Sequence, residues 1–123
     1  IDMAWHDGYK EVDSVEEYEN SILKDFKIVP QVKGNSISHA FSHIFSGGYS
    51  AGYYSYKWAE LLEADAFDKF KKTGIFNKNT AEEFKNNILS KGNTDHPMNL
   101  YVGFRGREPK VDALLRKTGL TKS

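Results

Sequence analysis

The chain has 123 residues, and its 17 lysines and arginines balance its 17 aspartates and glutamates. This length suits one compact domain. A neutral chain has no general attraction for nucleic acid, so we expect no nucleic-acid partner. The absence of cysteine excludes disulfides, thiol nucleophiles and thiolate metal ligands. No apolar run approaches the length of a membrane span, and we expect no membrane partner either.

The first predicted helix spans residues 15–26. Ser14 and Glu17 have the spacing of a capping box, and apolar residues follow at helical spacing. Proline and glycine then interrupt the pattern, so residues 27–38 should form an irregular connection. Only residues 26–32 show any strand-like alternation.

Glycines and prolines delimit the other predicted helices. The longest runs from Tyr49 to Thr73 and is closed by Gly74. The remaining helices are expected at three places: residues 80–90 before Gly92; a segment from Pro97 with Met98, Leu100, Tyr101 and Phe104 as apolar positions; and Pro109 to Gly119, burying Val111, Leu114 and Leu115. These elements predict an all-α fold, with residues 1–123 forming a single unit.

Tyrosines are concentrated at the start of the longest predicted helix. On a helical wheel of about 100° per residue, one stripe collects Tyr49, Tyr53, Tyr56, Glu60, Glu63 and Phe67. Tyr54, Trp58 and Leu61 fall roughly opposite. A tyrosine-rich helix is more often a core helix whose hydroxyls bond to neighbours than a ligand site.

A glycine pair and two histidines precede this stripe. Gly47 and Gly48 suit a loop that closes over a ligand, although a tight turn is the commoner use of such a pair. His39 and His43 have i, i+4 spacing, but neither a third ligand nor an HExxH pattern accompanies them, so we predict no metal site in this chain. Imidazole and phenol donors beside a flexible loop suit the stabilisation of an oxyanion. They do not activate water as a metal does.

Residues 39–60 strongly resemble the thimet-oligopeptidase family of zinc metallopeptidases, with the oligopeptidase A and peptidyl-dipeptidase branches most similar. The similarity covers essentially the whole chain and includes residues 2–6, 65–67, 74–77, 88–92, 104–109, 112–115 and 119–120. The resemblance implies a mostly helical enzyme that cleaves short peptides in a deep channel. It also implies that zinc and the water-activating glutamate belong to an HExxH helix that precedes the segment seen here.

The chain is therefore expected to be the C-terminal portion of a peptidase catalytic domain that is inactive alone, and its first residue, Ile1, agrees with a fragment. Zn²⁺ would be bound only in the full-length parent. The expected partners are short peptide substrates and the missing N-terminal part of the same polypeptide, and the expected location is cytoplasmic.

The resemblance also implies roles for individual residues. His43 corresponds by position to a histidine that contacts substrate or oxyanion, and Tyr49 to the tyrosine of a loop that closes over the peptide. Tyr56 corresponds to a tyrosine that donates a hydrogen bond to the tetrahedral intermediate. These three are the expected catalytic residues, and the expected substrate-binding residues are Gly47, Gly48 and Tyr53.

Two further alternatives follow from the residues alone. Arg105 and Arg107 either hold the terminal carboxylate of a peptide or form structural ion pairs between the last two helices, and we favour ion pairs. His6 and His96 are interpreted as structural or surface residues. The alternative function is a non-catalytic helical module whose tyrosine-lined face binds a peptide or a cation.

Overall fold

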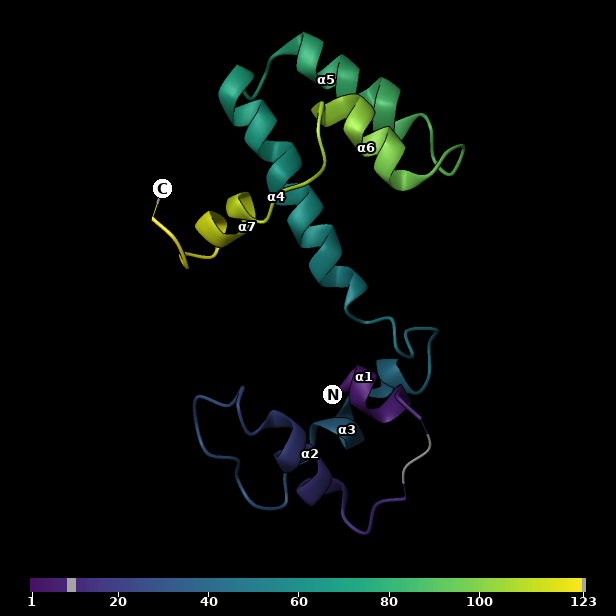
Figure 1. Ribbon diagram of the computed structural model, residues 1–123, viewed down its shortest axis with the longest axis vertical. Coiled ribbons are helices and arrows are strands. Elements are labelled where there is room, and N and C mark those ends of the chain that lie inside the picture. Colours follow the sequence, from purple (N-terminus) through teal and green to yellow (C-terminus); the bar gives the residue numbers. More distant parts are fainter. Residues whose placement is uncertain (9–10, 123) are drawn as a thin grey trace. The chain divides into compact units, whose positions relative to one another are not determined.

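The computed structural model describes residues 1–8 and 11–122, and every regular element in these residues is helical (Figure 1). The all-α prediction is confirmed. The chain divides into two compact units, Ile1–Ser55 and Tyr56–Ser123. Among the described residues, no helix combines the length and the apolar character needed to cross a membrane.

The described residues of the first unit form the short helices α1 (Asp2–His6), α2 (Val15–Leu23) and α3 (Ile37–Ala40) and the 3₁₀ turn η1 (Ser42–Ile44). The Ser14 hydroxyl accepts a hydrogen bond from the Glu17 N–H, as the predicted N-cap requires. The helix ends three residues earlier than predicted because Phe26 is 79% exposed and gains no burial from a longer helix. The segment between α2 and α3 is irregular, as expected, and no strand forms over residues 26–32.

A fully buried glutamate joins α2 to the start of α3. The Glu19 carboxylate accepts hydrogen bonds from the Ser36 hydroxyl (2.6 Å) and from the N–H groups of Ile37 (3.0 Å) and Ser38 (2.6 Å). Burial favours the neutral acid, but these donors outweigh it and lower the pKa of Glu19 to about 2. The indole N–H of Trp5 donates to the Ser38 hydroxyl (2.7 Å), which ties α1 to the same turn.

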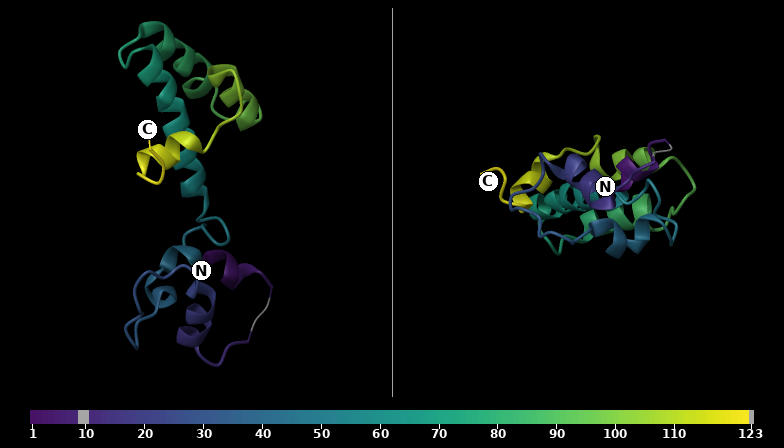
Figure 2. Two further views of the ribbon diagram at one scale, coloured as in Figure 1. Left: turned by 60° about the vertical axis from the view of Figure 1, so that its left-hand side comes forward. Right: turned by 90° about the horizontal axis from the view of Figure 1, so that it is seen from below.

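The second unit is built on one long helix. Its elements are α4 (Ser55–Thr73, whose first residue closes the first unit), α5 (Lys78–Phe84), the π-helical turn η2 (Lys85–Leu89), α6 (Pro97–Arg105) and α7 (Asp112–Lys117). The three views of Figures 1 and 2 show α5 and α6 side by side, with η2 packed on α6. Gly103 permits this close approach, since a Cβ there would lie 3.1 Å from the Asn87 side-chain oxygen.

The core of the second unit is aromatic. Phe104 is 1% exposed, and its ring meets those of Phe84 and Phe70 at 5.1 and 6.1 Å between centroids. Ala66 and Tyr101 are buried beside it, and Leu62 and Ile88 pack around them. Burial of such large apolar side chains is the main favourable term in a domain of this size.

The ends of the helices follow the glycine and asparagine signals. Gly74 follows α4 with φ of 108°, and Asn77 caps α5 by accepting from the Thr80 N–H. The last helix is shorter than predicted and starts at Asp112. Its buried residue is Ala113, and the prediction that Val111 is buried is wrong because Val111 precedes the first helical turn.

The dependence of stability on pH should report the buried carboxylate of Glu19. Its pKa is about 2 in the folded unit against 4.5 for the ordinary group, so the ionised form stabilises the fold above about pH 4.5. This contribution is lost as the pH falls toward 2. We expect Glu19→Gln to remove about 3 kcal/mol of unfolding free energy at pH 7 and much less at pH 2. Urea denaturation followed by tryptophan fluorescence measures both values.

Glu16→Gln is the matched control, because Glu16 lies on the same helix and accepts a hydrogen bond from the Gly34 N–H in an exposed position. This change should stay within about 0.5 kcal/mol at either pH. Equal effects of the two substitutions would contradict the role given to Glu19.

Candidate functional site

Three of the predicted site residues meet in the first unit. The ring centroids of His43 and Tyr49 lie 5.9 Å apart, those of His43 and Tyr53 lie 5.9 Å apart, and those of the two tyrosines lie 6.0 Å apart. Phe41 packs edge-on against Tyr53 at 4.5 Å. We call these four residues the aromatic cluster. It joins one imidazole and two phenols, which are uncharged donors when the imidazole is neutral.

The loop that carries the tyrosines contains three residues in the left-handed backbone region. Gly47 and Gly48 have φ of 106° and 81°, and Ala51 has φ of 56°. Glycine adopts such angles without strain, whereas alanine does not. The Ser50 hydroxyl donates to the carbonyl of the fully buried Ile44 (2.8 Å), so the loop is attached to η1 as well.

Asp2 in α1 holds the same loop from the opposite end of the unit's sequence. One carboxylate oxygen accepts from the Ala51 N–H and the other from the Tyr53 N–H, both at 2.9 Å. The His6 ring nitrogen lies 3.1 Å from the first of these oxygens. Burial opposes ionisation, but the donors from Tyr53 and Ala51 outweigh it and hold the pKa of Asp2 below its usual value.

Asp2 is not among the site residues expected from the sequence. Its only local signal is the i, i+4 spacing to His6, which predicts a helix pair and says nothing about a loop that lies some 50 residues away.

The predicted helical stripe is wrong over its first part. Helix α4 begins at Ser55 rather than at Tyr49, so Tyr49 and Tyr53 lie in a turn and share no helical face with Tyr56. The physical reason is tertiary. Asp2 accepts from the Tyr53 N–H, which a helix beginning at Tyr49 would pair with the Tyr49 carbonyl, and the left-handed angle at Ala51 interrupts the helical backbone.

Tyr56 lies in the first turn of α4 and belongs to the second unit. The stripe residues that α4 does contain, Tyr56, Glu60, Glu63 and Phe67, are all exposed. On the opposite face Trp58 is 52% exposed, and Leu61 and Leu62 are only partly buried. The first two turns of α4 are therefore largely open to solvent within their own unit.

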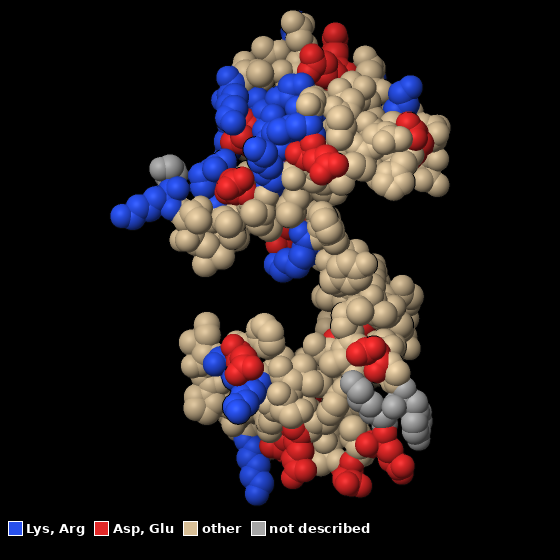
Figure 3. All heavy atoms as spheres, viewed as in Figure 1, with Lys and Arg blue, Asp and Glu red and all other residues tan. Residues whose placement is uncertain are grey.

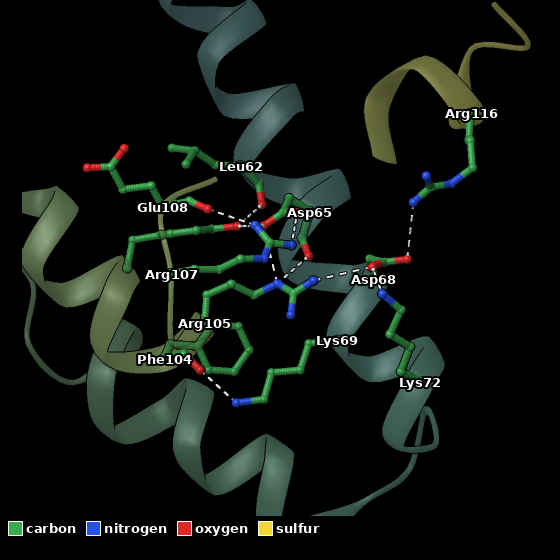
Figure 4. A network of polar contacts seen from close by, with 11 residues as sticks. Leu62, Asp65, Asp68, Lys69, Lys72, Phe104, Arg105, Arg107, Glu108 and Arg116 are labelled. Atoms are coloured by element: carbon green, nitrogen blue, oxygen red, sulfur yellow. Dashed lines mark hydrogen bonds and ion pairs between the residues drawn. The ribbon is translucent and has the colours of Figure 1, made fainter. Parts of the chain in front are cut away.

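Arg105 and Arg107 form structural ion pairs, as favoured. Asp65 of α4 is 1% exposed and accepts from Arg107 Nη2 (2.7 Å), Arg105 Nε (3.2 Å) and the Tyr101 hydroxyl (2.7 Å) (Figure 4). These donors outweigh burial and lower the pKa of Asp65, while burial and the neighbouring carboxylate raise that of Tyr101.

The partner of these arginines differs from the prediction. Both pair with α4, not with the last helix, and Arg105 also reaches Asp68 (3.2 Å), which Arg116 of α7 approaches at 3.5 Å. Figure 3 shows the basic side chains gathered over α4 and α7 with acidic ones among them. The Arg105 side chain is 9% exposed and its Nε and Nη2 pair with carboxylates of α4, which supports the ion-pair interpretation over capture of a terminal carboxylate.

The other histidines have structural contacts. His6 bonds to Asp2, and the His96 ring nitrogen caps α6 by accepting from the Met98 N–H (3.2 Å). His39 and His43 belong to two successive helical elements, α3 and η1, rather than to one helix. Within residues 1–8 and 11–122, no three His, Asp or Glu side chains are grouped so that they could hold a metal ion.

Comparison with known proteins places this helical chain, which carries the aromatic cluster, among the peptidases. Residues 1–120 match Peptidase family M3, and the chain belongs to that family. Over 99 residues it is 52% identical to oligopeptidase A of Escherichia coli, an alignment that covers 80% of this chain. It is 40% identical to the probable cytosolic oligopeptidase A of Arabidopsis thaliana over 98% of the chain, and 36% identical to dipeptidyl carboxypeptidase of Salmonella typhimurium over 99%.

These relatives are much longer than the chain. The aligned part amounts to 15% of the E. coli protein and to 18% of each of the other two. The resemblance inferred from residues 39–60 is confirmed, and the chain corresponds to a small part of the proteins it resembles.

A methyl group added to either glycine of the pair should meet no other atom, but it should strain the left-handed backbone at that residue. A Cβ on Gly48 would meet nothing within 4 Å, so the cost of Gly48→Ala comes from its φ of 81° alone. We expect the unfolding free energy to fall by about 1 kcal/mol. Urea denaturation measures this, with Gly52→Ala as the control, because Gly52 lies outside the left-handed region and its added Cβ meets only ordinary contacts. Equal losses in the two variants would contradict the strain argument.

Proposed function

We propose that the chain is the C-terminal part of the catalytic domain of a zinc-dependent oligopeptidase or peptidyl-dipeptidase that hydrolyses short peptides. The observation that supports this proposal is the meeting of His43 of η1 with Tyr49 and Tyr53 of the following loop, in a chain of Peptidase family M3. The described residues do not provide a zinc-binding set. The proposal therefore assigns zinc and the water-activating carboxylate to the part of the polypeptide outside this chain.

The donors of the aromatic cluster suit one requirement of peptide hydrolysis, which is stabilisation of the oxyanion. When water adds to a peptide carbonyl, negative charge develops on the carbonyl oxygen, and a donor already in place stabilises that charge more than the neutral substrate. We assign such donation to Tyr56 and His43, and the positioning of the substrate to Tyr49. Tyr53 and the backbone at Gly47 and Gly48 would line the bound peptide.

The rest of the polypeptide is the proposed partner of the chain. The length of the relatives supports this, and so does an apolar groove of about 530 Å³ in the second unit. Trp58, Leu62, Phe67 and Met98 are among the residues that line it. Of these, Trp58 and Phe67 are 52% and 40% exposed, and a further segment of the polypeptide would bury them. We also propose a cytoplasmic location, which the name of the Arabidopsis cytosolic relative supports.

The chain alone should not hydrolyse peptides. The prediction is no turnover of an internally quenched fluorescent peptide in the presence of added zinc, because residues 1–8 and 11–122 supply donors but no group of side chains that could hold a water-activating metal. Turnover that a chelator abolishes would contradict the proposal. Binding of the peptide without hydrolysis, by the chain and by its full-length parent alike, would favour the non-catalytic module with a tyrosine-lined face.

In the full-length parent, Tyr56→Phe should lower kcat by roughly 10²–10³-fold, the loss typical of one oxyanion donor, and should change KM little. The hydroxyl acts mainly in the transition state, so the ground-state complex loses little. Steady-state kinetics with a quenched peptide measures both constants. Tyr54→Phe is the control, since Tyr54 is a neighbouring tyrosine, 56% exposed, without an assigned role. An unchanged kcat in the Tyr56 variant would remove Tyr56 from the site.

A further inference from the structure

A single carboxylate fixes the backbone that presents two of the site tyrosines. We propose that Asp2 is a positioning residue of the peptidase site, one that acts by holding residues 49–53 in the conformation that places Tyr49 and Tyr53 beside His43. The proposal rests on the proposed function and assigns to it a residue that does not itself touch substrate.

The geometry of the contact is specific. The two oxygens of Asp2 each accept one N–H, from Ala51 and from Tyr53, and both distances are 2.9 Å. Two bonds from one planar group to alternate residues fix both the position and the orientation of the loop. The Asp2 side chain is 10% exposed, so water competes poorly for these donors.

The carboxylate is itself held in place. The His6 ring nitrogen lies 2.8 Å from the Asp2 carbonyl and 3.1 Å from its carboxylate, which ties the acceptor to its own helix. The donors from the loop also favour the ionised form, so that both oxygens are acceptors near neutral pH. An asparagine at this position would offer one oxygen and would point an NH₂ group at an N–H.

The conformation that Asp2 holds is one that the local sequence disfavours. Ala51 has φ of 56°, an angle that a non-glycine residue keeps only where its surroundings impose it. The same residues have the periodicity of a helix continuing back from α4 to Tyr49. When Asp2 no longer accepts these hydrogen bonds, Ala51 can return to the right-handed region, and the first turn of a longer helix can form. Tyr49 and Tyr53 would then leave His43.

Glu19 provides a comparison within the same unit. It is also a buried carboxylate that accepts two backbone N–H bonds, but it holds Ile37 and Ser38 at the start of α3 and not the tyrosine loop. Loss of Glu19 should lower stability, whereas loss of Asp2 should change the site.

The test uses the full-length parent enzyme with Asp2→Asn and, as the matched control, Glu19→Gln. Hydrogen exchange of the peptide covering residues 49–53 and steady-state kinetics are measured below the melting temperature of each variant. In Asp2→Asn we expect exchange at Ala51 and Tyr53 to accelerate at least tenfold. We expect kcat to fall by about 100-fold, the cost of a displacement of about 1 Å in a positioned group. Glu19→Gln should lower Tm and leave kcat and the exchange of residues 49–53 unchanged.

A second substitution distinguishes loss of the loop conformation from general destabilisation of the fold. Adding Ala51→Gly to Asp2→Asn removes the strain at residue 51, so the loop can keep its conformation without the carboxylate, and kcat should recover in part. If Asp2→Asn does not fold, Asp2→Glu keeps the charge and displaces the oxygens by one methylene. It should then show faster exchange and a lower kcat in the same direction.

Unchanged exchange at residues 49–53, or faster exchange with an unchanged kcat, would overturn the proposal. The proposal would also be overturned if kcat fell by the same factor in Asp2→Asn and in Glu19→Gln. If the wild-type parent hydrolyses no peptide, the proposed function fails independently of Asp2. The exchange measurement then still decides whether Asp2 holds the loop.

Discussion

A carboxylate that is removed from water stays ionised only if several donors surround it, and this constraint organises both units of the chain. Asp2 collects two backbone N–H groups from the tyrosine loop, and Glu19 collects two from the start of α3 with a hydroxyl beside them. Asp65 collects two guanidinium groups and a phenol. In each case the acid connects segments that are distant in the sequence, so the donors it needs determine which segments meet.

The helices could be predicted from the sequence where their ends depend on local residues. The Ser14 cap and the glycine after α4 act through their immediate neighbours, and the structure has helix ends at both of these places. The start of α4 could not be predicted in this way. Residues 49–54 have helical periodicity, but the hydrogen bonds that Asp2 accepts from Ala51 and Tyr53 override it, and a local pattern does not contain them.

In the candidate site too, some features could be predicted from the sequence and others could not. The family resemblance implies roles for His43, Tyr49 and Tyr53, and the structure groups these three residues although the helix expected to align the tyrosines begins only at Ser55. Arg105 and Arg107 illustrate the opposite case. Their ion-pair role was predictable from their surroundings in the sequence, but their partner was not, because Asp65 lies 40 residues earlier and carries no signal of burial.

The bonds from Asp2 to Ala51 and Tyr53 also have a consequence for the order of folding. They connect residues separated by 49 and 51 positions, close to the full span of the first unit. Contacts of such separation form only after the entropy of closing a long loop has been overcome, and they slow folding. During synthesis on a ribosome, α2 and its cap can form as soon as they emerge. The tyrosine loop acquires its final shape only once residue 53 has been synthesised and is free to reach Asp2.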